Sequence, residues 1–424
     1  MRCMMENWKS KMIEYFAAGV TDQKRLGVEI EHFIVDKITG KAISYEGKKG
    51  VRSILSKLVE QYPDALILPE DDFLGFMVPD FSITLEPAAQ FEISIRPVTS
   101  IRDAEEIYLG FLSNINPILS GMGYEMITAG CQPVSKMDEL TLIPKKRYAI
   151  MNHHFKSTGT GGMEMMRGTS SMQVSIDYSS EEDFSRKIRA AYYYGPVLKL
   201  LTDNSKSFQG LMLDTNLKRT DIWRRTDPVR CGILPGIFSK HYGFSDYADF
   251  IGHVPPIFLK HGTDLELAGN RTVEEIFADR EMDEELQRHV LSMVFPDVRL
   301  KQYLEIRFAD SVPLPFLNAY TALVKGLFYS EAGLTFADEQ IRRGGLKEED
   351  ILISEDDIIR RGWNASVYQT DCNKLAKRVL ETACEGLEGE EKKYLAPFED
   401  VICYGGIGNI PDHSLRHFRK ENCA

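Results

Sequence analysis

Paired cysteines are missing from this sequence. Its seven cysteines are scattered over 424 residues, are odd in number and never occur as Cys-x-x-Cys. This usage argues against a disulfide framework and against a zinc site built on cysteine. It is typical of proteins in a reducing compartment.

Long apolar runs are also missing. No stretch approaches the ~18 uninterrupted apolar residues that a membrane-spanning helix requires. The N-terminal stretch 5–16 is amphipathic and charged, without the apolar centre of a secretory signal. We therefore expect a cytoplasmic protein with no membrane partner.

An excess of positive charge is the third absence. Lys and Arg number 51 against 63 Asp and Glu, so the formal net charge is −12 at pH 7. Binding to nucleic acid needs an excess of basic side chains on one surface, and we expect no such partner. The basic runs 145–147 and 186–189 are long enough to contact a nucleotide but not a duplex.

Carboxylates, in contrast, recur at alternate positions in three segments that read as β-strands, 27–33, 86–94 and 303–307. Residues two apart in a strand point to the same face. The pairs that share a face are Glu29 with Glu31, Gln90 with Glu92, and Glu305 with Arg307. The residues between them are apolar and predict a buried underside: Val28, Ile30, Phe91, Ile93, Leu304, Ile306 and Phe308.

An ordinary sheet with one solvated face would show the same alternation in any one segment. Three segments of one design favour a shared site instead. If the polar faces converge, the carboxylates repel one another and need cations to hold them together. Several Mg²⁺ ions carrying a polyphosphate would suit such a site. Arg307 has a planar fork that fits a carboxylate or a phosphate, although a simple salt bridge with Glu305 is the alternative.

The rest of the chain predicts strands separated by helices. We expect helices over 51–61, 102–121, 181–203 and 314–331. The first and third carboxylate strands extend over about 26–36 and 301–308, and further strands are expected near 124–131 and 171–178. Other expectations are a bulge at 87–89, loops and short elements forming a lid over 205–270, and a charged helical region over 336–395. Strands with one polar face favour a mixed or antiparallel sheet backed by helices, the α+β class. We expect one catalytic domain over 1–424, with a core at about 25–330 and a helical shell at about 331–424.

Two smaller motifs have competing interpretations. Gly159–Gly162 is either a flexible connector or a loop whose amides approach a ligand, and it is not a phosphate-binding Walker loop. The run Tyr404–Gly408 lacks the context of a dinucleotide fingerprint and predicts a turn. The adjacent His153 and His154 favour a structural or surface role. No arrangement of Ser, Cys and His names a nucleophile and its base, so catalysis would depend on metal ions and positioning.

Five segments, in the family's order, resemble signatures of glutamate–cysteine ligases of the plant and proteobacterial type. Residues 27–33 and 83–92 look like the two N-terminal signatures. Residues 146–151 resemble the Arg-Tyr-x-x-Met stretch, and 164–174 the Met-Met…Thr-x-x-x-Gln-Val segment. Residues 299–310 resemble the Leu-Glu-x-Arg-x-Ala-Asp motif.

The resemblance implies an ATP-dependent carboxylate–amine ligase with a curved, glutamine-synthetase-like sheet. Such an enzyme uses ATP to phosphorylate the γ-carboxylate of L-glutamate. The γ-glutamyl phosphate then reacts with the amine of L-cysteine to give γ-glutamylcysteine, the first step of glutathione biosynthesis. The partners implied are these small molecules, with Mg²⁺ as cofactor.

The matching positions imply roles for individual residues. Five carboxylates would hold Mg²⁺: Glu29, Glu31, Glu86, Glu92 and Glu305. Arg307, with Glu305 beside it, would act in catalysis by contacting the transferring phosphoryl group or a substrate carboxylate. Thr169 and Gln173 would lie on the strand that lines the substrate pocket. Arg147 and Tyr148 are further candidates for substrate contact.

Three departures from the plant pattern leave the acceptor open. Ala88-Ala89 stands where plant-type members usually have Gly-Gly, and Asp310-Ser311-Val312-Pro313 replaces Asp-Gly-Gly-Pro. The Arg near Thr169 is shifted by one residue. The metal carboxylates are intact, but a γ-glutamyl ligase with another amine acceptor is an alternative. A non-catalytic homologue that binds ATP and Mg²⁺ is another. No cysteine pair matches the redox control of plant members.

Overall fold

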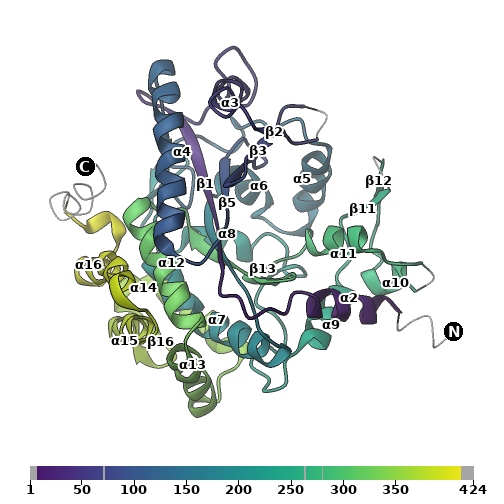
Figure 1. The fold of residues 1–424 in the computed structure, drawn as a ribbon, viewed down its shortest axis with the longest axis vertical. Helices are drawn as coiled ribbons and strands as arrows, with labels where there is room; N and C mark the ends of the chain where they lie inside the picture. The colour runs from purple at the N-terminus through teal and green to yellow at the C-terminus, as the bar shows by residue number, and fades with distance from the viewer. Residues whose placement is uncertain (1–6, 70–71, 262–263, 279, 412–424) are drawn as a thin grey trace.

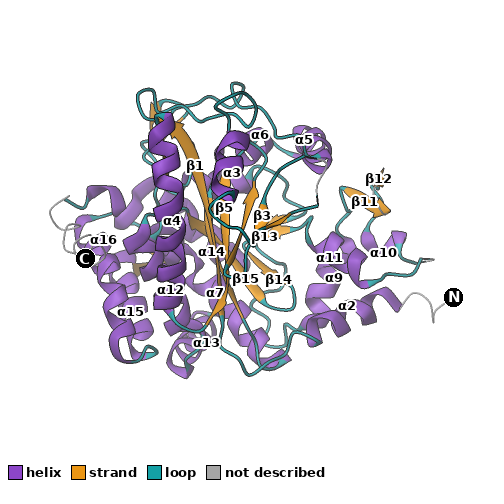
Figure 2. Cartoon of the chain, turned by 45° about the horizontal axis from the view of Figure 1, so that its top comes forward, coloured by secondary structure: helices purple, strands orange, loops and turns teal. Residues whose placement is uncertain are grey.

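A large antiparallel sheet runs through the centre of the molecule (Figure 2). The computed structural model describes residues 7–69, 72–261, 264–278 and 280–411. The strands of the sheet are β1 Leu26–Asp36, β2 Leu66–Ile67, β3 Phe76–Met77, β4 Phe81–Leu85, β5 Phe91–Val98, β6 Tyr124–Ile127, β7 Ser171–Ile176, β14 Val298–Leu300 and β15 Leu304–Asp310. Their order is β14-β15-β7-β1-β5-β4-β3-β2, and β6 pairs with β1. Every pairing within this sheet is antiparallel, and the expected α+β class is confirmed.

Helices and short two-stranded sheets surround the main sheet. The helices are α2 Asn7–Ala17, α3 Val51–Val59, α4 Ile101–Met122, α5 Lys146–Thr158, α6 Gly162–Gly168, α7 Glu181–Leu201, α8 Lys218–Arg224, α9 Phe244–His253, α10 Val273–Ile276, α11 Glu284–Leu291, α12 Leu314–Phe328, α13 Glu331–Gly344, α14 Glu348–Arg361, α15 Cys372–Glu385 and α16 Ala396–Tyr404. Short 3₁₀ turns lie at η1 Gly362–Asn364, η2 Gly389–Leu395 and η3 Ile407–Asn409. The small sheets pair β8 Ser207–Phe208 with β9 Leu211–Met212, β10 Cys231–Gly232 with β13 Phe295–Pro296, β11 Phe258–His261 with β12 Asp264–Leu267, and β16 Ser366–Val367 with β17 Thr370–Asp371. No helix in the described part of the chain is long and apolar enough to cross a membrane.

The apolar face of the sheet packs on three long helices. α4 contacts β5, α7 contacts β15, and α12 contacts both β1 and β7. Figure 1 shows α4 and α12 following one another along the sheet beside β1. The expected underside is buried at every position: Val28, Ile30, Phe91, Ile93, Leu304, Ile306 and Phe308. Because this face is occupied, the polar face is the one left for chemistry.

Local capping explains where the long helices begin. Ser180 precedes α7, and its hydroxyl accepts a hydrogen bond from the amide of Asp183 at 3.0 Å. Ser100 does the same for α4 through Asp103. Gly123 ends α4 with φ of 84°, a conformation that glycine adopts without steric cost. The helices expected over 102–121 and 181–203 are therefore confirmed, with small differences at their ends.

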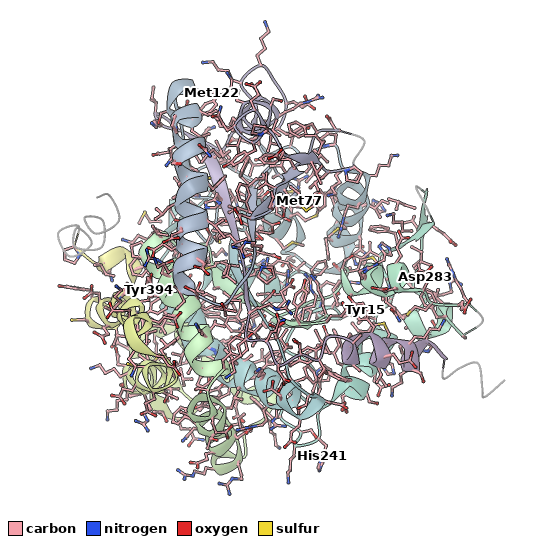
Figure 3. All side chains as sticks on the ribbon, in the orientation of Figure 1. Tyr15, Met77, Met122, His241, Asp283 and Tyr394 are labelled. Atoms are coloured by element: carbon pink, nitrogen blue, oxygen red, sulfur yellow. The ribbon has the colours of Figure 1, made fainter. Side chains whose placement is uncertain are left out.

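The segment 205–270 differs from the expectation of loops and short elements, because it contains α8 and the ten-residue α9. α9 packs against α2, and α11 also contacts α2. Figure 3 places Tyr15 of α2 and Asp283, the residue before α11, in this same lobe. The N-terminal helix is thus part of a small helical lobe beside the sheet rather than a free arm.

The region 336–395 is largely helical, as expected, and the C-terminal helices lie together on one side of the molecule, green to yellow in Figure 1. α13, α14 and α15 all contact α7, and α12 contacts α13, α15 and α16. A buried ion pair fastens α14 to this framework: Nζ of Lys199 lies 2.7 Å from Asp297 and 2.6 Å from Glu355. One connected set of buried apolar side chains extends from Trp8 to Ile410. The division into one domain with a core and a shell stays a prediction.

Candidate active site

The polar face of the sheet collects the residues singled out in the sequence. On β1, Glu29 lies opposite Gln173 of β7, and Glu31 lies opposite Glu92 of β5. β15 pairs with the other edge of β7 and carries Glu305. Because side chains alternate along a strand, the neighbouring strands direct these polar groups to one side of the sheet.

These side chains line a single cavity of about 260 Å³. The residues that the family resemblance implied are all on its wall: Glu29, Glu31, Glu86, Glu92, Arg147, Tyr148, Thr169, Gln173, Glu305 and Arg307. The polar faces of the strands therefore converge on one cavity, as expected. The catalytic, substrate and metal roles of the individual residues stay predictions.

The segment 86–94 is not the single bulged strand that its sequence suggests. β4 and β5 are separate strands joined by a hairpin turn at 86–90. The amide of Glu86 donates to the carbonyl of Gln90 at 2.9 Å and closes the turn. Pro87 sits in the turn, where the lack of an N–H removes no ladder hydrogen bond. The bulge was the wrong interpretation, but Glu86 still lines the cavity.

Glu31 is buried and receives hydrogen bonds from the start of β7. Ser171 donates from its amide at 2.7 Å and from its hydroxyl at 2.8 Å. Burial raises the pKa of Glu31, while Arg219 and the two bonds from Ser171 act in the opposite direction. The carboxylate is thus held in one orientation without a direct ion pair in the described part of the chain.

Three further carboxylates, Glu29, Glu86 and Glu92, have no ion pair with any described residue. Burial raises the pKa of Glu29, and the charge of Glu305 raises it further. Burial, followed by repulsion from Glu31, raises the pKa of Glu86 to about 7. Burial and the neighbouring glutamates raise the pKa of Glu92 well above its usual range. A cation in the cavity would relieve this repulsion.

Glu305 is the exception, because three cations surround it. Arg299 and Arg307 donate to one oxygen at 2.7 and 2.8 Å, and Lys301 donates to the other at 2.9 Å. Burial alone would raise the pKa of Glu305, but the three cations hold it well below its usual range. Arg307 also donates to the side-chain oxygen of Gln173 at 2.6 Å. The salt bridge between Glu305 and Arg307 therefore exists and fixes the guanidinium in the cavity wall.

The remaining expected residues come from α5 and from the residue that ends α6. The resemblance implied that Thr169 lies on the strand, but it lies between α6 and β7. Its hydroxyl donates to the carbonyl of Met165 at 2.8 Å. Arg147 of α5 stands over the ring of Tyr148 at 5.8 Å. Its buried Nε has no hydrogen-bond partner among the described residues.

Sequence reasoning missed two residues of α8 that complete the cavity, Arg219 and Trp223. Arg219 is 6% exposed and donates to the carbonyl of Arg307 at 3.1 Å. The Nε of Arg219 and the indole N–H of Trp223 have no partner within the described ranges. The weak periodicity of 205–270 gave no signal for them. Arg299 and Lys301 were also missed. They lie six and four residues before Glu305, a spacing that puts them on the same strand face, and this signal could have identified them.

The smaller motifs have other surroundings. Thr160 and Gly161 of the glycine loop donate their amides to the carbonyl of Arg225, both at 2.9 Å. The hypothesis that these amides contact a ligand is therefore wrong. His153 is exposed, and His154 lies 3.0 Å from the carboxylate of Asp227. These positions agree with the structural or surface role expected for the two histidines.

The donor set of the cavity suits Mg²⁺ in its chemistry. As the side chains lie, no group of three or more carboxylates, histidines or cysteines in the described chain is arranged to hold one ion. Mg²⁺ commonly takes one or two carboxylates and completes its shell with water and substrate phosphates. Oxygen ligands without ion pairs, in a cavity that also carries arginines, fit that mode of binding.

Comparison with known proteins gives one consistent answer. Residues 25–422 match the model of a protein family described as glutamate–cysteine ligase family 2. The chloroplastic glutamate–cysteine ligase of Medicago truncatula is 30% identical over 410 residues, covering 94% of this chain and 80% of the relative. That of Arabidopsis thaliana is 28% identical over 435 residues, covering 93% and 83%. The Francisella tularensis glutamate–cysteine ligase, solved in complex with AMP, superimposes with a TM-score of 0.58 at 10% identity, over 94% of this chain and 85% of that one. The last comparison shows a shared fold.

Proposed function

Because the chain belongs to glutamate–cysteine ligase family 2, we propose that its cavity joins L-glutamate to L-cysteine at the expense of ATP. The γ-carboxylate of glutamate takes the terminal phosphoryl group of ATP, and ADP leaves. The cysteine amine then attacks the acyl carbon, phosphate leaves, and γ-glutamylcysteine forms. The observation that supports this most is the single cavity in which the five carboxylates meet Arg307 and Arg219.

The cationic side chains would bind the charges of the reactants. Arg307 is held rigidly by Glu305 and Gln173, so its guanidinium can stabilise the phosphoryl group during transfer without first reorganising. Arg219 and Arg147 each have an unpaired buried Nε and would bind substrate carboxylates. Thr169 and Gln173 line the same wall and would contact the substrate beside them.

Mg²⁺ would be held by Glu29, Glu31, Glu86 and Glu92, the carboxylates on β1, β5 and the turn before β5. When bound, the metal neutralises the phosphate oxygens and makes the terminal phosphoryl group a better electrophile. Glu305 as a metal ligand stays a prediction, because three cations occupy its oxygens. Its first role would be to orient Arg307.

The nucleotide would enter from a groove that adjoins the cavity at Glu29. This groove of about 470 Å³ is lined by Gly19, Gly27, Arg25 and Tyr303, with Glu29 shared between the two spaces. Gly27 and Glu29 lie on the same face of β1, so a molecule extended along that face passes from groove to cavity. Gly27→Val would narrow the groove, and we expect a higher KM for ATP with little change for the amino acids.

Partners and location follow from weaker observations. The substrates are small molecules, and we propose a cytoplasmic location because the cysteines are unpaired in the sequence. The Medicago truncatula and Arabidopsis thaliana relatives are chloroplastic. Fractionation of the source cells would decide between the two locations.

The test is ADP release by the purified protein with Mg²⁺, ATP and L-glutamate, with and without L-cysteine. We expect release that depends on cysteine, with γ-glutamylcysteine identified by its mass. If ADP release requires glutamate but does not depend on cysteine, the acceptor is a different amine. Tight ATP binding with no turnover on any amine would overturn the proposal in favour of a binding protein.

A further inference from the structure

The glycine loop Gly159–Gly162 contacts the end of α8 rather than the cavity. The carbonyl of Arg225, the residue that caps α8, accepts the amides of both Thr160 and Gly161 at 2.9 Å. Next to the loop, the hydroxyl of Thr158 donates to the carbonyl of Thr226 at 2.9 Å. The loop thus satisfies carbonyl groups that the short helix leaves without intrahelical partners.

At positions 159 and 161 the loop lies too close to α8 for any residue other than glycine. A Cβ atom at Gly159 would lie 2.2 Å from the carbonyl oxygen of Arg225, and one at Gly161 would lie 2.3 Å from that of Ile222. Both obstacles are backbone atoms, which cannot swing aside as a flexible side chain can. The glycines therefore fix the distance between the loop and α8.

An ion pair between elements reinforces this contact. The guanidinium of Arg225 lies 2.9 Å from Glu164 of α6 and donates to the hydroxyl of Thr160 at 3.2 Å. It also pairs with Asp221 of its own helix at 2.9 Å. The bond to Glu164 is the one that joins two elements, since Asp221 moves together with Arg225.

The two elements that are joined here pack against each other and both line the cavity. α8 contributes Arg219 and Trp223, and α6 contributes Met165 and Met166. Arg219 and Trp223 each have a buried nitrogen without a hydrogen-bond partner among the residues described. Arg219 is tied to β15 by its bond to the carbonyl of Arg307, and the indole N–H of Trp223 has no bond to a described residue. The place of both side chains in the cavity therefore depends on where α8 stands.

We propose that the glycine loop and the Glu164–Arg225 pair are positioning elements that hold Arg219 and Trp223 for the amino-acid substrate. The inference rests on the proposed function of the cavity. It explains a motif that the substrate and metal sites leave without a role. The groove proposed for the nucleotide contains no residue of α6 or α8, so we expect the effect to fall on the amino acid and to spare ATP.

The test is Glu164→Gln, which removes the charge that α6 contributes to its bond with Arg225 and keeps the pair with Asp221. We expect the KM for L-glutamate to rise about 10-fold, because small displacements of a positioning group are costly. The KM for ATP and the melting temperature should stay as in the wild type. Glu391→Gln is the matched control, since it breaks a comparably exposed pair with Lys325 between η2 and α12, away from the cavity.

Gly161→Ala is a second variant that acts on the same contact from the loop, and it should raise the same KM. An unchanged KM for glutamate in Glu164→Gln would overturn the inference, and so would an equal rise for ATP. A double variant, Glu164→Gln with Arg225→Gln, should be no worse than Arg225→Gln alone. Turnover by the wild type separates this inference from the proposed function, because a failure of the latter leaves no activity in any of the proteins.

Discussion

Glu31 and Glu305 lie on the same polar face of one sheet, yet their pKa values move in opposite directions. Both are desolvated, which raises the pKa. Glu305 is bonded to Arg299, Lys301 and Arg307, and their charges outweigh the burial. Glu31 receives neutral donors, so burial prevails. The sheet therefore separates a region with paired charges at β15 from a region with unpaired carboxylates at β1 and β5.

At the residue scale, Glu29→Gln should abolish turnover. The change keeps the size of the side chain and removes one charge from the proposed Mg²⁺ ligands, so we expect kcat to fall at least 100-fold, on the order seen when electrostatic stabilisation is lost. Thermal unfolding should be nearly unchanged, which shows that the fold is intact. Glu125→Gln on β6, where the side chain is exposed, is the control. Full activity in Glu29→Gln would show that Glu29 is not a ligand of the metal.

His32 gives a pH dependence of stability. Its ring is buried between the carbonyl of Phe91, 3.0 Å away, and the hydroxyl of Tyr108, 2.7 Å away. Burial lowers the pKa of His32 from 6.5 to about 4. Between these values the unfolded chain binds a proton that the folded protein does not, so stability present above pH 6.5 is lost as the pH falls towards 4.

The loss attributable to His32 is about 3 kcal/mol of unfolding free energy when the pH falls from 6.5 to 4. Urea unfolding of the wild type and of His32→Gln at several pH values measures this loss, because the variant has no imidazole at position 32 to bind a proton. We expect the stability advantage of the wild type to shrink as the solution becomes acidic. A constant difference between the two proteins would contradict the assignment.

At the scale of elements, the sequence was informative where a local rule acts alone. The helices over 102–121 and 181–203 were expected, and the alternation in the segments of β1, β5 and β15 placed the carboxylates on one face. The turn at 86–90 was misread because Pro87 excludes a central strand but does not distinguish a bulge from a turn. α8 was missed because it has no apolar stripe, and its position depends on contacts with distant residues such as Gly161 and Glu164.

The turn before β5 offers a test of its backbone. Ala89 has φ of 66°, in the left-handed region that disfavours a side chain, whereas Ala88 does not have a positive φ. Ala89→Gly should therefore stabilise the protein by about 0.5–1 kcal/mol, while Ala88→Gly should destabilise it by about the same amount. Denaturant unfolding of the two variants checks this. Equal effects of the two substitutions would mean that the turn has another conformation.

At the scale of the whole molecule, different helices cover the two faces of the central sheet. α4, α7 and α12 cover the apolar face, and α5, α6 and α8 carry residues that wall the polar face. An acyl phosphate hydrolyses readily, so a site enclosed by protein protects the intermediate from water. The enclosure also explains why Glu86 and Glu92, which have no cation bonded to them among the described residues, have raised pKa values.

Removal of metal should affect turnover and thermal stability together. With EDTA in excess, ADP release should fall to background, and added Mg²⁺ should restore it. The melting temperature should rise by several degrees with Mg²⁺ and ATP together, since ligands that bind only the folded state stabilise it. The rise should be smaller with Mg²⁺ alone, because nucleotide phosphates supply part of the metal shell. Turnover that resists EDTA would contradict the metal assignment.

The ammonium of Lys199, shared by Asp297 and Glu355, has a consequence for protein engineering. A minimal enzyme cut back to the motif-bearing core would end before α14 and lose Glu355. A buried charge that loses a partner typically costs about 3–5 kcal/mol, a large part of the stability of most domains. Shortened or circularly permuted versions should therefore keep the chain at least to Arg361, where α14 ends.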